Sequence, residues 1–366
     1  MRILITNNTL NARMGTELYV RDLALRLRAL GHEPAAWSTG LGEVAEALRS
    51  GGIPVTDDLA RLPFQPEIIH GQHHLDTMTA LLALPGVPAV YFCHGAVPWE
   101  EIPPVFPRIH RYVAIDQACR ERIVNECQID AAKTVTLLNF VDLERFQPRP
   151  PLPEKPRRAL VFSNYARKNE ALEIIRAACA SQGISLDVVG AGVENATDAP
   201  EKILPQYDLV FAKGRSALEA VAVGCAVIIW SGNDCGPLVT SEEFDRLRAF
   251  NFGYRTATQP LTRKFISGQI ARYDAADAAA VSRKLRAQAD LRDTVDQIVR
   301  LYETVLAEHR QTPSDPVAEA LAAAVYWQKI LPLIKHGPKP VPRTARSKFR
   351  EQLARKAEKI TRWLRK

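Results

Sequence analysis

The sequence predicts an α/β protein made of two successive domains, each a parallel sheet covered by helices. Strand-like apolar runs alternate with helical stretches throughout the chain. The alternation stops at a linker, Pro148–Pro156, which packs five prolines into nine residues, and then resumes. A length of 366 residues also exceeds one ordinary core. We therefore expect domains at residues 1–150 and 151–335, followed by a Pro-rich tether and tail at 336–366.

The first half alternates short strands with helices. The expected strands are Arg2–Thr6, Glu33–Trp37, Glu67–His70, Ala89–Cys93, Tyr112–Ile115 and Thr134–Leu138. Helical spacing of apolar residues predicts helices at Thr16–Leu30, Asp76–Leu84 and Gln117–Cys127. Strands that alternate with helices in this way indicate a parallel sheet with helices on both faces.

The pattern restarts after the linker. The expected strands are Ala159–Ser163, Ser185–Val189, Tyr207–Ala212 and Ala226–Trp230. The expected helices are Glu170–Gln182, Ser216–Val223 and nearly all of 276–310. Two Rossmann-like domains in series imply a cleft between the carboxyl ends of their sheets, where such folds bind ligands.

The composition excludes several classes of protein. The apolar fraction of 46% and the charged fraction of 24% are typical of a globular chain. We expect no membrane-spanning helix, because no uninterrupted apolar run approaches the required ~18 residues, and the N-terminus lacks the features of a signal peptide. The six cysteines form no CxxC pair and are typical of thiols in a reducing compartment. The expected location is the cytoplasm.

The net charge of +7 is concentrated in the tail. Residues 343–366 contain ten Lys/Arg and two Glu, a net of +8, so the preceding 342 residues carry a net of −1. A nearly neutral body makes nucleic acid an improbable partner. The tail also has apolar residues at helical steps, namely Phe349, Leu353, Ala357, Ile360 and Leu364.

That spacing predicts a basic amphipathic helix in residues 343–366. Such helices bind anionic membrane surfaces, and this interpretation places the protein at the inner face of the cytoplasmic membrane. Two alternatives remain open, a helix that packs its apolar stripe on the body and a disordered basic tail.

Two strand ends in the first half could bind ligands. Gly15 directly precedes a predicted helix, and a glycine there allows close approach of an anion to the helix N-terminus. The alternative is that Gly15 eases a turn and Thr16 caps the helix. His94 follows the strand Ala89–Cys93, where an imidazole can contact a hydroxyl in the cleft.

The second half has a richer candidate site. A strand runs into Lys213, Gly214, Arg215 and Ser216 at a helix start, which favours a diphosphate. Glu219 lies one turn later and could accept hydrogen bonds from a vicinal diol. The alternative is a capping box between Ser216 and Glu219.

Basic residues also follow the first strand of the second half. Arg167 and Lys168 stand there and could reach phosphates from another side.

Other motifs are absent or incomplete. Gly190-Ala191-Gly192 lacks the third glycine of a dinucleotide fingerprint, so NAD is not expected. His70, His73, His74 and Asp76 have no metal-site spacing, and no Asp-x-Asp motif occurs. We therefore expect no metal and no bound cofactor.

The order of motifs resembles the retaining glycosyltransferases of family 4, which have the GT-B fold. The matching segments are Gly15-Thr16-Glu17 with Gly31-His32, Glu67–His70, His94-Gly95, Asn139–Asp142 with Phe146 and Pro148, and Glu219–Val227. Together they cover roughly residues 1 to 305. Position 211, where the family has the first of two glutamates, is Phe211 in this chain. The family's Arg–Lys pair would fall near Ser163 and Lys168.

The resemblance implies a metal-independent glycosyltransferase that uses a nucleotide-sugar donor. It places the donor diphosphate against Gly15, Lys168, Lys213 and Arg215, the ribose against Glu219 and the transferred sugar near His94. The implied acceptor is a glycan or a lipid-linked hydroxyl compound in envelope or surface glycan synthesis. The alternatives are a nucleotide-sugar epimerase or inverting transferase on the same fold, and a non-catalytic scaffold that docks on membranes.

Overall fold

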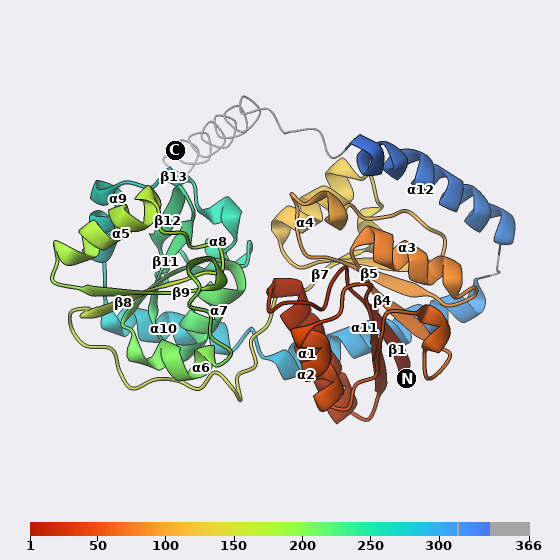
Figure 1. Cartoon of the computed structure of the whole chain (residues 1–366), viewed down its shortest axis with the longest axis horizontal. Coiled ribbons are helices and arrows are strands. Elements are labelled where there is room, and N and C mark those ends of the chain that lie inside the picture. The colour runs from red at the N-terminus through yellow and green to blue at the C-terminus, as the bar shows by residue number, and fades with distance from the viewer. Residues whose placement is uncertain (313–314, 337–366) are drawn as a thin grey trace, which may run out of the picture. The chain divides into compact units, whose positions relative to one another are not determined.

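The computed structural model describes residues 1–312 and 315–336. The chain divides into two compact units, Met1–Asp315 and Pro316–Lys366. Two sheets lie in the first unit, and the described part of the second unit is one helix, α12 (Pro316–His336) (Figure 1). The predicted basic helix at 343–366 and the tether before it, from residue 337, lie outside the described residues.

The first sheet has seven parallel strands in the order β3-β2-β1-β4-β5-β6-β7. They are β1 (Arg2–Thr6), β2 (Glu33–Trp37), β3 (Val55–Thr56), β4 (Ile68–Gln72), β5 (Ala89–Cys93), β6 (Ile109–Ala114) and β7 (Thr134–Thr136). The helices between them are α1 (Gly15–Ala29), α2 (Glu43–Ser50), α3 (His74–Ala83) and α4 (Gln117–Glu121). Every strand predicted for this half is therefore present, with small shifts at the ends.

The second sheet has the order β13-β12-β11-β10-β8-β9. Four strands are parallel, β8 (Arg158–Phe162), β9 (Ser185–Val189), β10 (Leu209–Ala212) and β11 (Ala226–Ser231), while β12 (Asp234–Leu238) and β13 (Gln259–Pro260) are antiparallel. Its helices are α5 (Glu170–Ala180), α6 (Pro200–Ile203), α7 (Gly214–Val223), α8 (Phe244–Arg248), α9 (Arg263–Ile270) and α10 (Ala275–Arg286). The sequence pattern did not predict β12, because Gly236 and Pro237 interrupt its apolar run, and it did not predict β13, which has only two residues.

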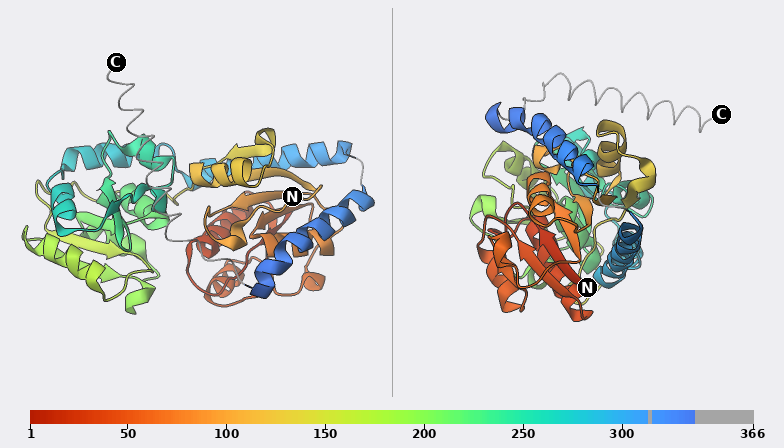
Figure 2. Two further views of the ribbon diagram at one scale, coloured as in Figure 1. Left: turned by 90° about the horizontal axis from the view of Figure 1, so that it is seen from above. Right: turned by 90° about the vertical axis from the view of Figure 1, so that its right-hand side faces the viewer.

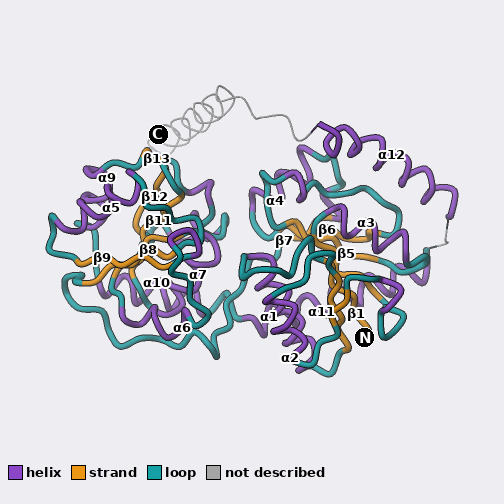
Figure 3. The backbone as a smooth tube through the Cα atoms, viewed as in Figure 1, coloured by secondary structure: helices purple, strands orange, loops and turns teal. Residues whose placement is uncertain are grey.

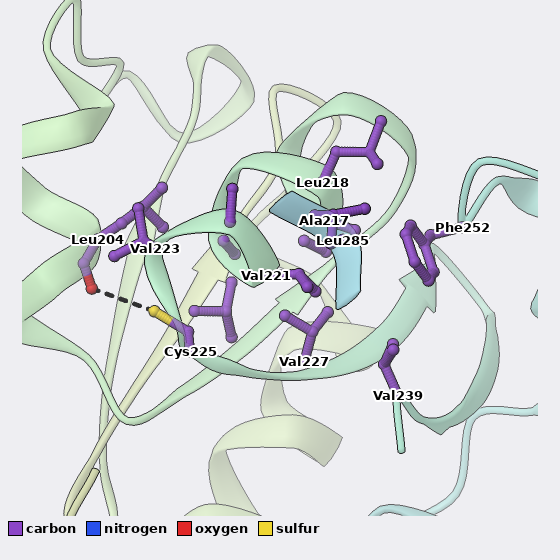
Figure 4. Packing of buried hydrophobic residues seen from close by; sticks show 14 of the residues in the cluster. Leu204, Ala217, Leu218, Val221, Val223, Cys225, Val227, Val239, Phe252 and Leu285 are labelled. Carbon is purple, nitrogen blue, oxygen red and sulfur yellow. Dashed lines mark hydrogen bonds between the residues drawn. The ribbon is translucent and has the colours of Figure 1, made fainter. Parts of the chain in front are cut away.

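Helices cover both faces of the second sheet (Figure 3). One face packs against α5 and α9, and the other packs against α7 and α10. Figure 4 shows the second of these cores, in which the Cys225 thiol lies 3.3 Å from the Leu204 carbonyl oxygen. Asn169 and Thr262 start α5 and α9 by accepting backbone N–H bonds with their side chains. These caps fix where each helix begins relative to the sheet.

The chain crosses between the two sheets twice. Val141, Leu143 and Phe146 already belong to the core of the second sheet. The last long helix of the first unit, α11 (Leu291–Gln311), returns to the core of the first sheet, where Ile298 and Tyr302 are fully buried. The core clusters therefore divide the chain near residues 140 and 290, whereas the sequence pattern placed the boundaries at 150 and 335.

The two crossings pair with each other. The Val141 N–H donates to the Ala289 carbonyl at 2.8 Å, and the Leu291 N–H donates to the Val141 carbonyl at 3.0 Å. The helix expected at 276–310 is broken here, at residues 287–290 between α10 and α11. Asp290 caps α11 by accepting the Arg292 N–H, so the break is a helix start and not a distortion.

Helix α12 corrects one expectation. It has 21 residues and a mean hydropathy of 1.3 over its most apolar window, so by length and composition alone it could cross a membrane. Only 11% of that window is buried. The expectation that no such segment exists was wrong, because Glu319 and Lys329 interrupt the apolar run without making the helix polar on average. Figure 2 shows the helix as a continuous rod.

Candidate functional site

The start of α7 lies at the carboxyl edge of the second sheet, directly after β10. Gly214 is its first residue and has a φ of 57°, in the left-handed region that glycine adopts without strain. A Cβ at this position would meet nothing within 4 Å, and no side chain caps the helix. The Gly214 N–H donates to the Phe252 carbonyl, and the other amides of the first turn have no side-chain acceptor among the residues that the structure describes. This geometry suits an anion.

Lys213 stands immediately before α7 and joins three strand ends. Its ammonium donates to the Ser231 hydroxyl at 2.9 Å, at the end of β11. The same nitrogen lies 5.4 Å from the ring centroid of Tyr165, which follows β8 and is exposed. Burial lowers the pKa of Lys213. A phosphate arriving here would meet a cation that is only partly hydrated.

Arg215 and Glu219 are engaged with each other. The Arg215 Nε donates to Glu219 Oε1 at 2.8 Å, and its Nη2 pairs with Asp22 of α1. Glu219 therefore does not return to the Ser216 backbone, and Ser216 lies inside α7 and not at its cap. The capping-box alternative is overturned by the structure, because the helix begins three residues earlier than the motif requires, with Lys213 and not Ser216 at the N-cap position.

The remaining predicted donor residues lie around this point. Gly15 is the first residue of α1, with nothing within 4 Å of an added Cβ, while Thr16 does not cap the helix and donates to Glu17 instead. Arg167 is exposed and donates to the carbonyls of Asn164 and Ala166, its own loop. Lys168 is exposed and makes no ion pair with any residue that the structure describes.

The loops that precede α1 and follow β8 are in contact. The Asn164 side-chain amide lies 3.3 Å from the Arg13 carbonyl and 3.7 Å from the Met14 sulfur. Arg13 also donates to the Asp198 carbonyl at 3.0 Å. Gly15, Lys213 and Glu219 are therefore held on loops and helices of the two halves that meet directly.

His94 lies at the carboxyl edge of the first sheet, after β5. Its ring packs edge-on against Tyr19 of α1, with centroids 4.5 Å apart. Its backbone N–H donates to Glu101 at 2.9 Å, and Glu101 also lies 3.4 Å from the Nε2 of His73. Glu101 thus links the ends of β4 and β5.

The titratable groups at this edge are held mainly in neutral forms. Burial lowers the pKa of His94 to about 3 and that of His73 to about 4. Burial raises the pKa of Glu101 to about 8, against the hydrogen bond from the His94 N–H. His73 also has a φ of 57° with a ψ of 129°, a strained conformation for a residue with a side chain.

Several polar side chains share one face of the first sheet near its carboxyl edge. Asn7, His70, Gln72 and His94 lie at positions two residues apart along β1, β4 and β5 or just beyond them. Among the described residues, Asn7 Oδ1, both amide atoms of Gln72 and the Nε2 atoms of His70 and His94 are buried without a hydrogen-bond partner. His70 is anchored through Nδ1, 2.6 Å from the Tyr302 hydroxyl. Buried polar atoms of this kind favour contact with water or with the hydroxyls of a ligand.

The residues suspected as metal ligands do not converge. In the part of the chain that the structure describes, no group of three or more His, Cys, Asp or Glu side chains could hold a metal ion.

Sequence reasoning missed Asp22, Tyr19, Glu101 and Tyr165. Tyr19 and Asp22 lie three residues apart on α1, which marks one helical face, but nothing in the spacing indicates that this face meets His94 and Arg215. Glu101 follows His94 by seven residues in a loop without a periodic pattern.

Comparison with known proteins agrees with the fold and with the motif order. Residues 14–145 match the family model described as Glycosyltransferase Family 4. A glycosyltransferase of Rickettsia africae is 14% identical, with a TM-score of 0.60, and the match covers 83% of this chain and 98% of that one. The Anabaena protein HepE, solved with UDP and glucose, is also 14% identical, with a TM-score of 0.60 and coverage of 83% and 99%.

A third similar structure belongs to a protein described with a different activity. A Listeria monocytogenes protein assigned as a UDP-N-acetylglucosamine 2-epimerase is 13% identical, with a TM-score of 0.52, and the match covers 86% of this chain and 99% of that one. A search of curated protein sequences gave no match. The predicted GT-B fold and the resemblance to family 4 are thereby confirmed.

Proposed function

We propose that the protein is a glycosyltransferase that moves a sugar from a nucleotide-sugar donor to a hydroxyl acceptor. The observation that carries this proposal is the direct contact between the start of α1 and the strand-end loops of the second sheet. That contact brings Gly15 toward Lys213, the α7 amides and Glu219, a set suited to a ribose diphosphate. The similar structure HepE was solved with UDP and glucose, which supports the same class of donor.

The chemistry follows from the charges at this point. A departing nucleoside diphosphate develops negative charge, which Lys213, Lys168 and the first-turn amides of α7 would stabilise. His94, whose ring is neutral and whose Nε2 has no protein partner among the described residues, would contact a hydroxyl of the transferred sugar. Asn7 and Gln72 add further donors and acceptors on the same face. We propose that no metal is required, so activity should persist in EDTA.

Replacement of Lys213 by alanine tests the phosphate assignment. We expect the affinity for UDP or GDP to fall at least tenfold, because a partly buried cation is removed, while the affinity for the nucleoside changes little. Isothermal titration of both ligands measures the two effects. Lys284→Ala is the matched control, since Lys284 is paired with Asp245 and lies over Phe244 on the same half. Equal losses for nucleotide and nucleoside would remove Lys213 from the phosphate site.

An epimerase is the second candidate, supported by the fold of the Listeria protein. The two activities give different products from one donor. Incubation with a panel of UDP- and GDP-sugars, followed by NMR of the products, separates them. A transferase releases the nucleotide, whereas an epimerase returns an isomeric nucleotide sugar without nucleotide release. Absence of donor binding at millimolar concentration would instead favour a non-catalytic scaffold.

We also propose that the acceptor is a lipid-linked or envelope glycan and that the C-terminal segment contacts an anionic membrane. Helix α12 exposes Val317, Leu321, Val325, Leu331 and Ile334. Ten Lys/Arg follow within residues 343–366. An exposed apolar helix followed by a cationic segment is typical of peripheral membrane proteins.

Liposome co-sedimentation tests this attachment. We expect the full chain to pellet with vesicles that contain phosphatidylglycerol and a chain ending at Pro342 to pellet less, because about 1 kcal/mol per basic residue is lost near the surface. Equal pelleting of both chains would assign the attachment to α12 alone. Pelleting of neither chain would contradict membrane contact.

A further inference from the structure

A buried cluster of four charged side chains joins the two halves of the molecule. Arg21 and Asp22 lie on α1, and Arg215 and Glu219 lie on α7. The side chains of Asp22 and Glu219 are each 7% exposed, and that of Arg215 is 16% exposed. Arg21 donates to Asp22 Oδ1 through Nε at 2.8 Å and through Nη2 at 2.6 Å. We call these four residues the α1–α7 cluster.

Arg215 forms ion pairs with two carboxylates within the α1–α7 cluster. Its Nη2 pairs with Asp22 Oδ2, and its Nε donates to Glu219 Oε1 at 2.8 Å. Burial lowers the pKa of Arg215, but the two carboxylates raise it by more, so the guanidinium stays charged. The cluster contains two cations and two anions and is neutral as a whole. Arg215 therefore adds no uncompensated charge for a diphosphate, unlike Lys213.

Arg215 limits the effect of burial on Glu219. Burial raises the pKa of Glu219, and the charge and hydrogen bond of Arg215 oppose that rise. Asp22, which is itself kept ionised by Arg215 and Arg21 in spite of burial, holds Arg215 from the other side. A vicinal diol presents two O–H donors and binds best to an ionised carboxylate in a fixed orientation.

We propose that Arg215, anchored by Asp22 of the first half, is a positioning residue that holds the Glu219 carboxyl group oriented to accept the ribose hydroxyls of the donor. This inference rests on the proposed function. It replaces the role expected for Arg215 as a phosphate ligand. It also makes recognition of the ribose depend on Asp22, a residue of the first half. Ribose binding and correct docking of α1 on α7 then become the same structural requirement.

The ratio of affinities for UDP and 2′-deoxy-UDP isolates this role, because the two ligands differ only in one ribose hydroxyl. GDP and 2′-deoxy-GDP are used if the guanine nucleotides are the ones that bind. We expect the unmodified chain to prefer the ribonucleotide and Glu219→Gln to lose most of that preference. Asp22→Asn, which keeps the shape but removes the anchor, should reduce the preference at least threefold, with little change in the affinity for 2′-deoxy-UDP.

A second variant separates positioning from phosphate binding. Arg215→Lys keeps the positive charge but cannot bridge two carboxylates through a planar fork. We expect it to reduce the ribose preference as Asp22→Asn does and to retain the affinity for 2′-deoxy-UDP. Asp296→Asn is the matched control, since Asp296 lies 4.0 Å from Arg26 of α1 and is outside the cluster.

The outcomes distinguish the two proposals. An unchanged ribose preference in Asp22→Asn and Arg215→Lys, with the unmodified chain binding UDP, would overturn the positioning role alone. Equal weakening of both nucleotides in these variants would return Arg215 to the phosphate site. Failure of the unmodified chain to bind any of the four nucleotides would overturn the proposed function, and the positioning role with it.

Discussion

The carboxyl edge of the first sheet and the α1–α7 cluster differ in the charge state of their buried ionisable groups. At the sheet edge, burial favours the neutral forms of His73, His94 and Glu101. In the cluster, Asp22 and Arg215 are as well buried but remain charged, because each has a partner of opposite charge in direct contact. The difference shows that burial alone does not decide the charge of a group, because a close counter-charge can offset the cost of burial. The first edge is therefore expected to respond to pH, and the second to loss of a partner.

Replacement of Arg215 should lower the free energy of unfolding more than replacement of Glu101. Arg215→Met leaves the carboxylates of Asp22 and Glu219 buried without their shared cation. We expect the free energy of unfolding to fall by about 3–5 kcal/mol, as for other broken buried ion pairs. Urea denaturation of the unmodified and variant chains measures it.

The control for that experiment is an exposed pair. Arg246 donates to Glu243 at 2.8 Å, but its side chain is 54% exposed. Arg246→Met should therefore cost less than about 1 kcal/mol. Similar losses for the two variants would mean that the α1–α7 cluster is stabilised no more than a surface pair.

Glu101→Gln tests the pH response of the first edge, with a smaller effect. The folded pKa of Glu101 is about 8, above an unfolded value of about 4.3, so the proton stabilises the folded state. That stabilisation is fully present below the unfolded pKa and is lost as the pH rises through 8. Glu101→Gln lacks this stabilisation. The difference in free energy of unfolding between the unmodified chain and the variant should therefore grow as the pH is lowered.

The expected growth is about 1.4 kcal/mol per pH unit between pH 7.5 and 5.5. Urea denaturation at three pH values measures it, and titratable groups that do not contact Glu101 contribute equally in both chains. A deficit that stays constant over this range would show that Glu101 is ionised in the folded state, held so by the N–H groups it accepts from.

The sequence predicted the strands well because their signal is local. A short apolar run such as Ala89–Cys93 indicates a buried strand without any information about the rest of the chain. The antiparallel strand β12 was missed because Gly236 and Pro237 break its local apolar pattern. The pairing that defines it, in which Leu238 lies opposite Ile228 of β11, is not visible in its own composition. Helix α12 was missed because a few charged residues interrupt it, although its mean hydropathy is still that of an apolar segment.

The candidate site was predictable only in part, for a similar reason. Lys213, Gly214 and Glu219 stand in one continuous motif, so their proximity follows from helix geometry. Asp22 is separated from Arg215 by 193 residues, and no periodicity in either helix indicates that they meet. The role of Arg215 changed for that reason, since its partner lies in another half of the molecule.

Helix α11 imposes an order on how the protein is made. The first sheet is synthesised early, but Val295, Ile298, Tyr302 and Val305 of its core belong to a helix translated after the whole second sheet. Until that helix emerges from the ribosome, the face of the first sheet beneath it stays uncovered and exposed to aggregation or to chaperones. The second sheet, whose core is complete by residue 289, has no such delay. The half made first is thus the half that finishes folding last.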